Sequence, residues 1–185
     1  MRCFGDGDAL YEHYHDAEWG RPQLSERELF EKVCLEAFQA GLAWITVLRK
    51  RAALREAFGG FDPVHVADLD VEPLLGDARL IRSRPKLQAC VTNARATLAL
   101  GGGLPELVRR YATAEPAPER WDAVPASTAG SAALARELKR AGFTFVGPVT
   151  AYSLLQACGL VGDHLRGCHV REEVEAQRRA ALGLA

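Results

Sequence analysis

The sequence contains no apolar run of the roughly 20 residues that a membrane-spanning helix requires. Its first residues also lack the apolar stretch of a signal peptide. Positive charge is not in excess, because the formal net charge is -1 at pH 7. Any nucleic-acid binding must then come from a local basic patch rather than from the overall charge. We expect a cytoplasmic protein that makes no membrane contact.

Disulfides are not expected either. The chain has five cysteines, and an odd count in a cytosolic protein argues against a disulfide framework. Its 185 residues suffice for one good-sized domain or for two small lobes that share a core.

Helical signals dominate the sequence, and no segment shows sustained alternation of apolar and polar residues with turns at both ends. Ser25 and Glu28 have capping-box spacing at the start of one helix, and Asp62-Pro63 opens a shorter one. The sequence therefore predicts an all-α fold. Its expected helices lie at 26–40, 42–51, 63–67, 72–77, 86–98, 131–141 and 149–158.

A short turn between two of these helices carries the densest basic stretch, formed by Arg79, Arg82, Arg84 and Lys86. Helix, short turn, helix is the outline of a helix-hairpin-helix motif. Backbone N–H groups at the start of the second helix suit a phosphate, and nearby cations add salt-dependent affinity. The alternative is that these cations are solvated helix ends.

A second pattern joins the two ends of the chain. Cys3 and His15 lie near the start, whereas His164 and Cys168 lie near the end, with the spacing His-x-x-x-Cys. Two thiolates and two imidazoles form a closed tetrahedral zinc site, which is typical of structural rather than catalytic zinc. Spacing alone leaves His13 and His169 as competing ligands, and it leaves open ordinary buried cysteines with surface histidines.

A third pattern combines aromatic residues with one carboxylate. Tyr11, Tyr14, Trp19 and Trp44 fall in the first quarter of the chain, and Glu36 lies within an apolar stretch. A base that is flipped out of a duplex needs aromatic faces to stack on and a polar group for its edge. The alternative is that the aromatic residues are core and that Glu36 is a solvated helix residue.

Taken in this order, the patterns make the sequence similar to the 3-methyladenine DNA glycosylase I family over nearly the whole chain. The matching stretches are 2–3, 14–16, 18–20, 29–31, 35–36, 39–42, 44–48, 61–63, 93–95, 142–143, 145–147, 156–161, 163–164 and 167–168. The resemblance implies a helix-hairpin-helix glycosylase fold with a zinc-bound lobe that joins the N- and C-terminal segments. Approximate lobe limits are 1–25 plus 125–185 for the zinc-bound lobe and 26–124 for the helix-hairpin-helix lobe.

The resemblance also assigns roles to residues. It implies one structural Zn²⁺ on Cys3, His15, His164 and Cys168. It implies Glu36 as the acidic residue that recognises the base and Tyr14 and Trp44 as stacking walls. The neighbouring pocket residues are Trp19, Tyr11 and Phe4, and the residues that approach DNA are Gly41 and Leu42, with Leu42 as a wedge.

The activity implied is hydrolysis of the N-glycosidic bond of 3-methyladenine in double-stranded alkylated DNA. The enzyme would be a monofunctional monomer of the bacterial cytosol that leaves an abasic site. The chain departs from the family pattern at three places. Phe4 stands near a usual tryptophan, and the two usual glycines of the hairpin are replaced by Arg79 or its neighbour Leu80 and by Pro85. Two rival functions are a hydrolytic zinc enzyme such as a nucleobase deaminase and a non-catalytic binder of damaged DNA.

Overall fold

The computed structural model describes residues 1–5, 7–114 and 118–184, and every regular element in those ranges is helical. This confirms the all-α prediction. The α-helices are α1 (Ala9–Ala17), α2 (Glu26–Gln39), α3 (Trp44–Ala57), α4 (Pro63–Ala67), α5 (Arg84–Ala99), α6 (Gly103–Arg109), α7 (Ala129–Arg140), α8 (Pro148–Ala157) and α9 (Arg171–Leu182). The 3-10 helices are η1 (Gly59–Phe61), η2 (Pro73–Gly76) and η3 (Trp121–Ala123). None of the described helices is long and apolar enough to cross a membrane.

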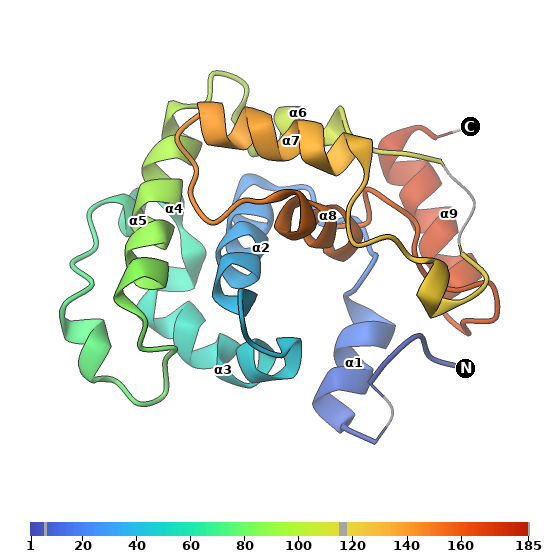
Figure 1. The fold of residues 1–185 in the computed structure, drawn as a ribbon, viewed down its shortest axis with the longest axis horizontal. Coiled ribbons are helices and arrows are strands. Elements are labelled where there is room, and N and C mark those ends of the chain that lie inside the picture. Colours follow the sequence, from blue (N-terminus) through green and yellow to red (C-terminus); the bar gives the residue numbers. More distant parts are fainter. Residues whose placement is uncertain (6, 115–117, 185) are drawn as a thin grey trace.

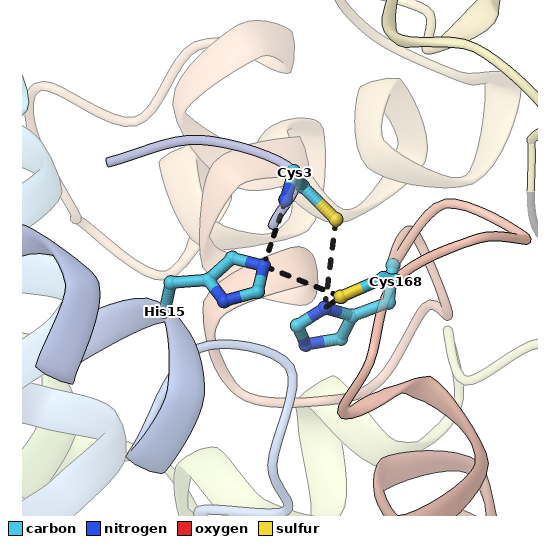
Figure 2. Close-up of side chains that lie close together, drawn as sticks. Cys3, His15 and Cys168 are labelled. Carbon is cyan, nitrogen blue, oxygen red and sulfur yellow. Dashed lines mark hydrogen bonds between the residues drawn. The ribbon is translucent and has the colours of Figure 1, made fainter. Parts of the chain in front are cut away.

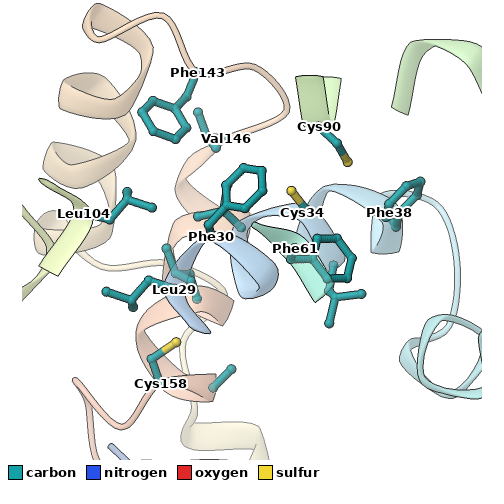
Figure 3. Packing of buried hydrophobic residues seen from close by; sticks show 14 of the residues in the cluster. Leu29, Phe30, Cys34, Phe38, Phe61, Cys90, Leu104, Phe143, Val146 and Cys158 are labelled. Atoms are coloured by element: carbon teal, nitrogen blue, oxygen red, sulfur yellow. The ribbon is translucent and has the colours of Figure 1, made fainter. Parts of the chain in front are cut away.

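Helix α2 runs through the middle of the molecule (Figure 1) and packs against α3, α5, α6 and α8. The predicted capping box starts it, since Ser25 and Glu28 exchange side-chain and backbone hydrogen bonds. Every residue of α2 from Leu29 to Phe38 is buried. Figure 3 shows Phe30 and Phe38 of this helix among side chains from distant segments, such as Phe61 and Phe143. One continuous buried cluster thus includes residues of both expected lobes, and the lobe boundary itself stays a prediction.

Several boundaries differ from the sequence prediction. The helix expected at 72–77 is the single 3-10 turn η2, which suits so short a connector. Helix α5 begins at Arg84 rather than Lys86, with Pro85 in its first turn. Helix α3 begins at Trp44 rather than Leu42, because Gly41 has φ +76° and Ala43 is extended. Helices α1 and α9 were not predicted from the sequence.

The N-terminus and α9 lie on the same side of the molecule (Figure 1). The guanidinium of Arg178 on α9 is fully buried. It donates to the carbonyl oxygens of Gly159 at 2.7 Å, Thr113 at 2.8 Å and Leu160 at 3.3 Å. Gly159 and Leu160 belong to the loop that follows α8, and Thr113 belongs to the loop that follows α6. Arg178 therefore attaches α9 to both loops.

We predict that Arg178→Met destabilises the protein by about 3–5 kcal/mol, because the buried carbonyl oxygens lose their donor. Arg179→Met is the matched control, since Arg179 neighbours Arg178 in the sequence but is exposed. Urea unfolding measures both variants. Equal stability of the two variants would show that the buried guanidinium does not hold the loops.

Candidate functional site

A cavity of about 310 Å³ opens beside the middle of α2. It is lined by Phe4, Tyr11, Tyr14, Trp19, Glu36, Gln39, Trp44, Trp121, Ser153 and Gln156. All six residues that the sequence analysis assigned to the base pocket are among them. The structure therefore brings together side chains from the N-terminal segment, α1, α2 and α3 around one carboxylate.

Aromatic rings form most of the wall. The Tyr14 ring on α1 lies 5.2 Å from the Trp44 ring at the start of α3, measured between centroids. The Phe4 ring lies 5.0 Å from both Tyr11 and Trp19. Phe4 thus occupies the centre of a cluster of rings, so an aromatic wall persists although the family's usual tryptophan is absent there.

Glu36 is the carboxylate that lines this cavity, and its side chain is buried, since the residue is only 5% exposed. The alternative of a solvated Glu36 is therefore wrong, although Tyr14, Trp19 and Trp44 do belong to the buried core cluster, as that alternative expected. Burial raises the pKa of Glu36 from 4.5 to about 7, while the positive charge of Lys32 acts in the opposite direction. A carboxyl group with a pKa near neutrality is typical of functional sites.

Four lining residues were missed by the sequence analysis. Gln39 lies one turn after Glu36 on α2, so helical spacing could have found it. Trp121, Ser153 and Gln156 come from segments far along the chain, and no local pattern identifies them. Trp121 is 48% exposed, and its ring lies 6.0 Å from that of Phe4 at the rim.

A smaller hollow of about 230 Å³ adjoins the cavity and shares Glu36, Gln39 and Ser153 with it. Its other walls are Ala40, Gly41 and Leu42 on one side and Val149 and Thr150 of α8 on the other. Leu42 is 39% exposed. The loop that the resemblance assigned to DNA approach therefore lies at a mouth leading toward Glu36.

A larger hollow of about 380 Å³ lies elsewhere and contains the carboxylate of Asp163. That carboxylate already accepts hydrogen bonds from the Tyr152 hydroxyl and the Gln156 amide, each at 2.6 Å. Its acceptor capacity is thus partly used within the protein. The aromatic cavity around Glu36 is the better candidate for binding a base.

The predicted basic turn is partly engaged within the protein. Arg79 pairs with Asp77 and Glu56, Arg84 pairs with Glu72, and Arg82 is exposed. Ser83, the N-cap residue of α5, makes no side-chain cap. The backbone N–H groups at the start of α5 therefore lack a side-chain partner from the cap residue.

Lys86, the last residue of the basic stretch, is also engaged within the protein. Its ammonium donates to the carbonyl oxygens of Phe38 at 2.9 Å and Ala40 at 2.5 Å. These carbonyls end α2, where a cation interacts favourably with the helix dipole. Burial lowers the pKa of Lys86. In this structure Lys86 joins α5 to the end of the helix that carries Glu36.

A group of potential metal ligands joins the chain ends, as the sequence predicted. One ligand atom each of Cys3, His15, His164 and Cys168 lies within 4.8 Å of all the others. Figure 2 shows three of them, Cys3, His15 and Cys168, pointing toward one another. The competing histidines are outside this group, since His13 is exposed and His169 contacts the Met1 carbonyl oxygen and Asp16.

The distances fit a tetrahedral ion. The Cys168 sulfur lies 3.5 Å from His15 Nε2 and 3.4 Å from His164 Nδ1, and the Cys3 sulfur lies 3.7 Å from His164 Nδ1. Sulfur and nitrogen ligands of one tetrahedral zinc lie about 3.5 Å apart. These spacings suit one tetrahedral metal ion, and His15 Nε2 also accepts a hydrogen bond from the Cys3 backbone N–H at 3.1 Å.

The remaining ring nitrogens of both histidines are occupied. His15 Nδ1 contacts Asp16 Oδ1 at 2.7 Å, and His164 Nε2 contacts the Trp19 carbonyl oxygen at 2.9 Å. Such contacts orient metal-binding histidines. Burial lowers the pKa of His164 to about 4, which favours the neutral ring that binds metals. Gly20 permits this packing, because its φ is +77° and a Cβ would lie 2.9 Å from the His164 ring.

Comparison with known proteins agrees with this architecture. A family model described as methyladenine glycosylase matches residues 4–172. The chain is 47% identical to DNA-3-methyladenine glycosylase 1 of Escherichia coli (strain K12), over 87% of this chain and 91% of that protein. It is 43% identical to DNA-3-methyladenine glycosylase of Haemophilus influenzae, over 90% and 96%.

A solved structure of 3-methyladenine DNA glycosylase I from Staphylococcus aureus, described as the basis of 3-methyladenine recognition, superposes with a TM-score of 0.87. It is 33% identical and covers 91% of this chain and 95% of that one. Fold and sequence together define a helical DNA glycosylase. The chain belongs to the methyladenine glycosylase family.

We predict that Glu36→Gln raises stability above neutral pH. Between pH 4.5 and about 7 the folded protein keeps the Glu36 proton that the unfolded chain loses, so stability falls as the pH rises. The glutamine variant avoids this loss, and we expect it to be more stable by up to about 3 kcal/mol at pH ~8, with no difference at pH ~4.

Urea unfolding across this pH range measures the effect. Glu172→Gln, which changes an exposed carboxylate of α9, is the control. A stability difference for Glu36→Gln that does not vary with pH would contradict the burial argument.

Proposed function

We propose that this protein hydrolyses the N-glycosidic bond of 3-methyladenine in alkylated double-stranded DNA. The observation that carries the proposal is a buried carboxylate, Glu36, in the wall of an aromatic cavity. The names of the relatives support the same substrate. Its relatives come from bacteria, so the place of action would be the bacterial cytosol. We also expect the protein to act as a monomer.

Methylation at N3 gives the base in DNA a positive charge and makes it a good leaving group. The ionised Glu36 would accept charge-assisted hydrogen bonds from this base. Tyr14 and Trp44 would stack on it and add cation–π attraction, which normal adenine lacks. Water then adds to the sugar carbon and loses a proton to solvent, the C1′–N9 bond breaks, and its electron pair leaves with the base, which becomes neutral. Selective binding thus supplies most of the discrimination.

The cavity supports a monofunctional reaction. No lysine lines it in the described ranges, so no amine is available there to form a Schiff base with the sugar. Lys86 is occupied by the carbonyl oxygens at the end of α2. We therefore expect an abasic site as the product rather than a cleaved strand.

The hollow between the Gly41–Leu42 loop and α8, which leads to Glu36, suggests where the DNA duplex would lie. Gly41 and Leu42 lie at its edge, and an exposed leucine suits the space that a flipped base leaves in the stack. The uncapped start of α5, with Arg82 and Arg84 nearby, would contact a phosphate. These contacts would position the protein on DNA without reading its sequence.

We also propose that the Cys3, His15, His164 and Cys168 group holds one structural Zn²⁺. Four protein ligands fill a tetrahedral site, so no position remains for a reacting water. This arrangement argues against the hydrolytic zinc enzyme considered as a rival. When bound, zinc would hold the ends of the chain together and would take no part in the bond cleavage at Glu36.

We predict that the protein releases 3-methyladenine from methylated DNA. Glu36→Gln should slow the release by about 10–100-fold, the worth of a charge-assisted contact, and Trp44→Ala should slow it as well, because a stacking face is lost. Chromatography of the released bases measures this, with Glu172→Gln as a control of unchanged rate. Release at the parental rate by both variants would refute the pocket assignment. Tight binding of methylated DNA without release would support the non-catalytic rival.

We predict that the purified protein contains about one zinc per chain, as four ligands to one ion require. Cys168→Ser should lose most of this zinc and melt at a lower temperature, because the metal link between the two ends of the chain is lost. Cys90→Ala is the control, since Cys90 is a buried thiol outside the group. Elemental analysis and thermal denaturation measure both effects. Full zinc content in Cys168→Ser would contradict the assignment.

A further inference from the structure

A lysine is fully buried directly beneath the aromatic cavity. Lys32 on α2 is 0% exposed, although lysine is almost never fully buried unless it is paired. Its ammonium pairs with one carboxylate oxygen of Glu18. It also lies 4.9 Å from the centre of the Tyr14 ring and 6.0 Å from that of Trp44. The same ammonium thus contacts both walls of the cavity without lining it.

Glu18 belongs to a longer series of ion pairs. Its second oxygen accepts a hydrogen bond from Arg51 at 2.6 Å, and Arg51 also donates to Glu31 at 2.6 Å. Glu31 in turn accepts from Arg55 at 2.8 Å. Glu18 therefore divides its charge between two cations, so that it does not fully neutralise Lys32.

Lys32 precedes Glu36 by four residues on the same helix, so both side chains lie on one face of α2. The other titratable groups that face Glu36 are the Tyr14 hydroxyl from α1 and the Cys158 thiol after α8. Burial raises the pKa of Tyr14 well above its usual range and that of Cys158 to about 12, so both are neutral near pH 7. Among the described residues, Lys32 is the charge that acts on the Glu36 pKa.

We propose that Lys32 is a positioning residue of the cavity: it holds Tyr14 and Trp44 from beneath and favours the ionised form of the Glu36 carboxylate, and Glu18 weakens this effect. The inference rests on the proposed function, in which an ionised Glu36 attracts a cationic base. Lys32 itself touches no substrate and acts through Glu36 and the two rings. Its place beneath the rings suits an electrostatic role that leaves the cavity free.

The test compares two substitutions with opposite expected effects. Lys32→Met removes the ammonium and keeps the length of the side chain, so the Glu36 pKa should rise. Glu18→Gln removes the carboxylate that offsets Lys32, so the Glu36 pKa should fall. Loss of packing alone would not move the two variants in opposite directions. Lys139→Met, a lysine change on the exposed face of α7, is the control.

The Glu36 pKa is measured directly by ¹³C NMR of the glutamate carboxyl carbons, with the Glu36 signal identified by its loss in Glu36→Gln. The rate of 3-methyladenine excision under single turnover is measured over the same pH range. A rise of about one in the Glu36 pKa would slow excision at pH 7 roughly fivefold, and the rate would recover at higher pH. An unshifted Glu36 signal in both variants would overturn the proposal.

A buried unpaired charge can prevent folding, so the double variant Lys32→Met/Glu18→Gln provides a second test, because it removes both partners together. Its Glu36 pKa should lie between those of the two single variants, because the two removed charges act in opposite directions, and a value outside that range contradicts the proposal. The NMR titration requires no substrate. If none of the proteins released 3-methyladenine, the proposed function would fail while the role of Lys32 was still decided.

Discussion

The central physical constraint in this structure is that helix α2 buries three charged side chains, which need partners to compensate for the loss of water. Ten consecutive residues of this helix are buried, and Glu31, Lys32 and Glu36 are among them. Desolvation of a charge costs free energy unless a partner compensates. Glu31 and Lys32 receive partners from α3 and from the end of α1, whereas Glu36 faces the cavity. Glu31 is therefore bound within the protein, whereas Glu36 lies where a ligand could reach it.

Local pattern could predict the elements whose burial follows from their own sequence. The capping box at Ser25 and the apolar stretch around Glu36 indicated a buried helix, and the structure contains it. Helix α9 could not be found in this way, because only Val174 and Arg178 are buried along it. Its position comes from loop carbonyls that accept from Arg178, and these belong to residues distant in the sequence.

The same limit applies to the sites. His13 and His15 are two residues apart, and only the orientation of α1 buries one and exposes the other. The order of matches to a known family selected His15, and spacing alone did not. Lys86 was expected to contact a phosphate, yet its ammonium lies on the carbonyl oxygens that end α2. Its two partners lie 48 and 46 positions earlier in the sequence, so only the tertiary structure shows these contacts.

The metal group and the cavity are separate in chemistry but adjacent in the chain. Tyr14 lines the cavity and His15, the next residue, points to the metal group, because successive side chains of α1 point in directions about 100° apart. The Trp19 side chain lines the cavity while its carbonyl oxygen contacts His164. A metal that fixes His15 and His164 therefore also fixes two walls of the cavity. A metal bound there would affect the cavity without taking part in bond cleavage, because it would hold the residues that carry two of the aromatic rings.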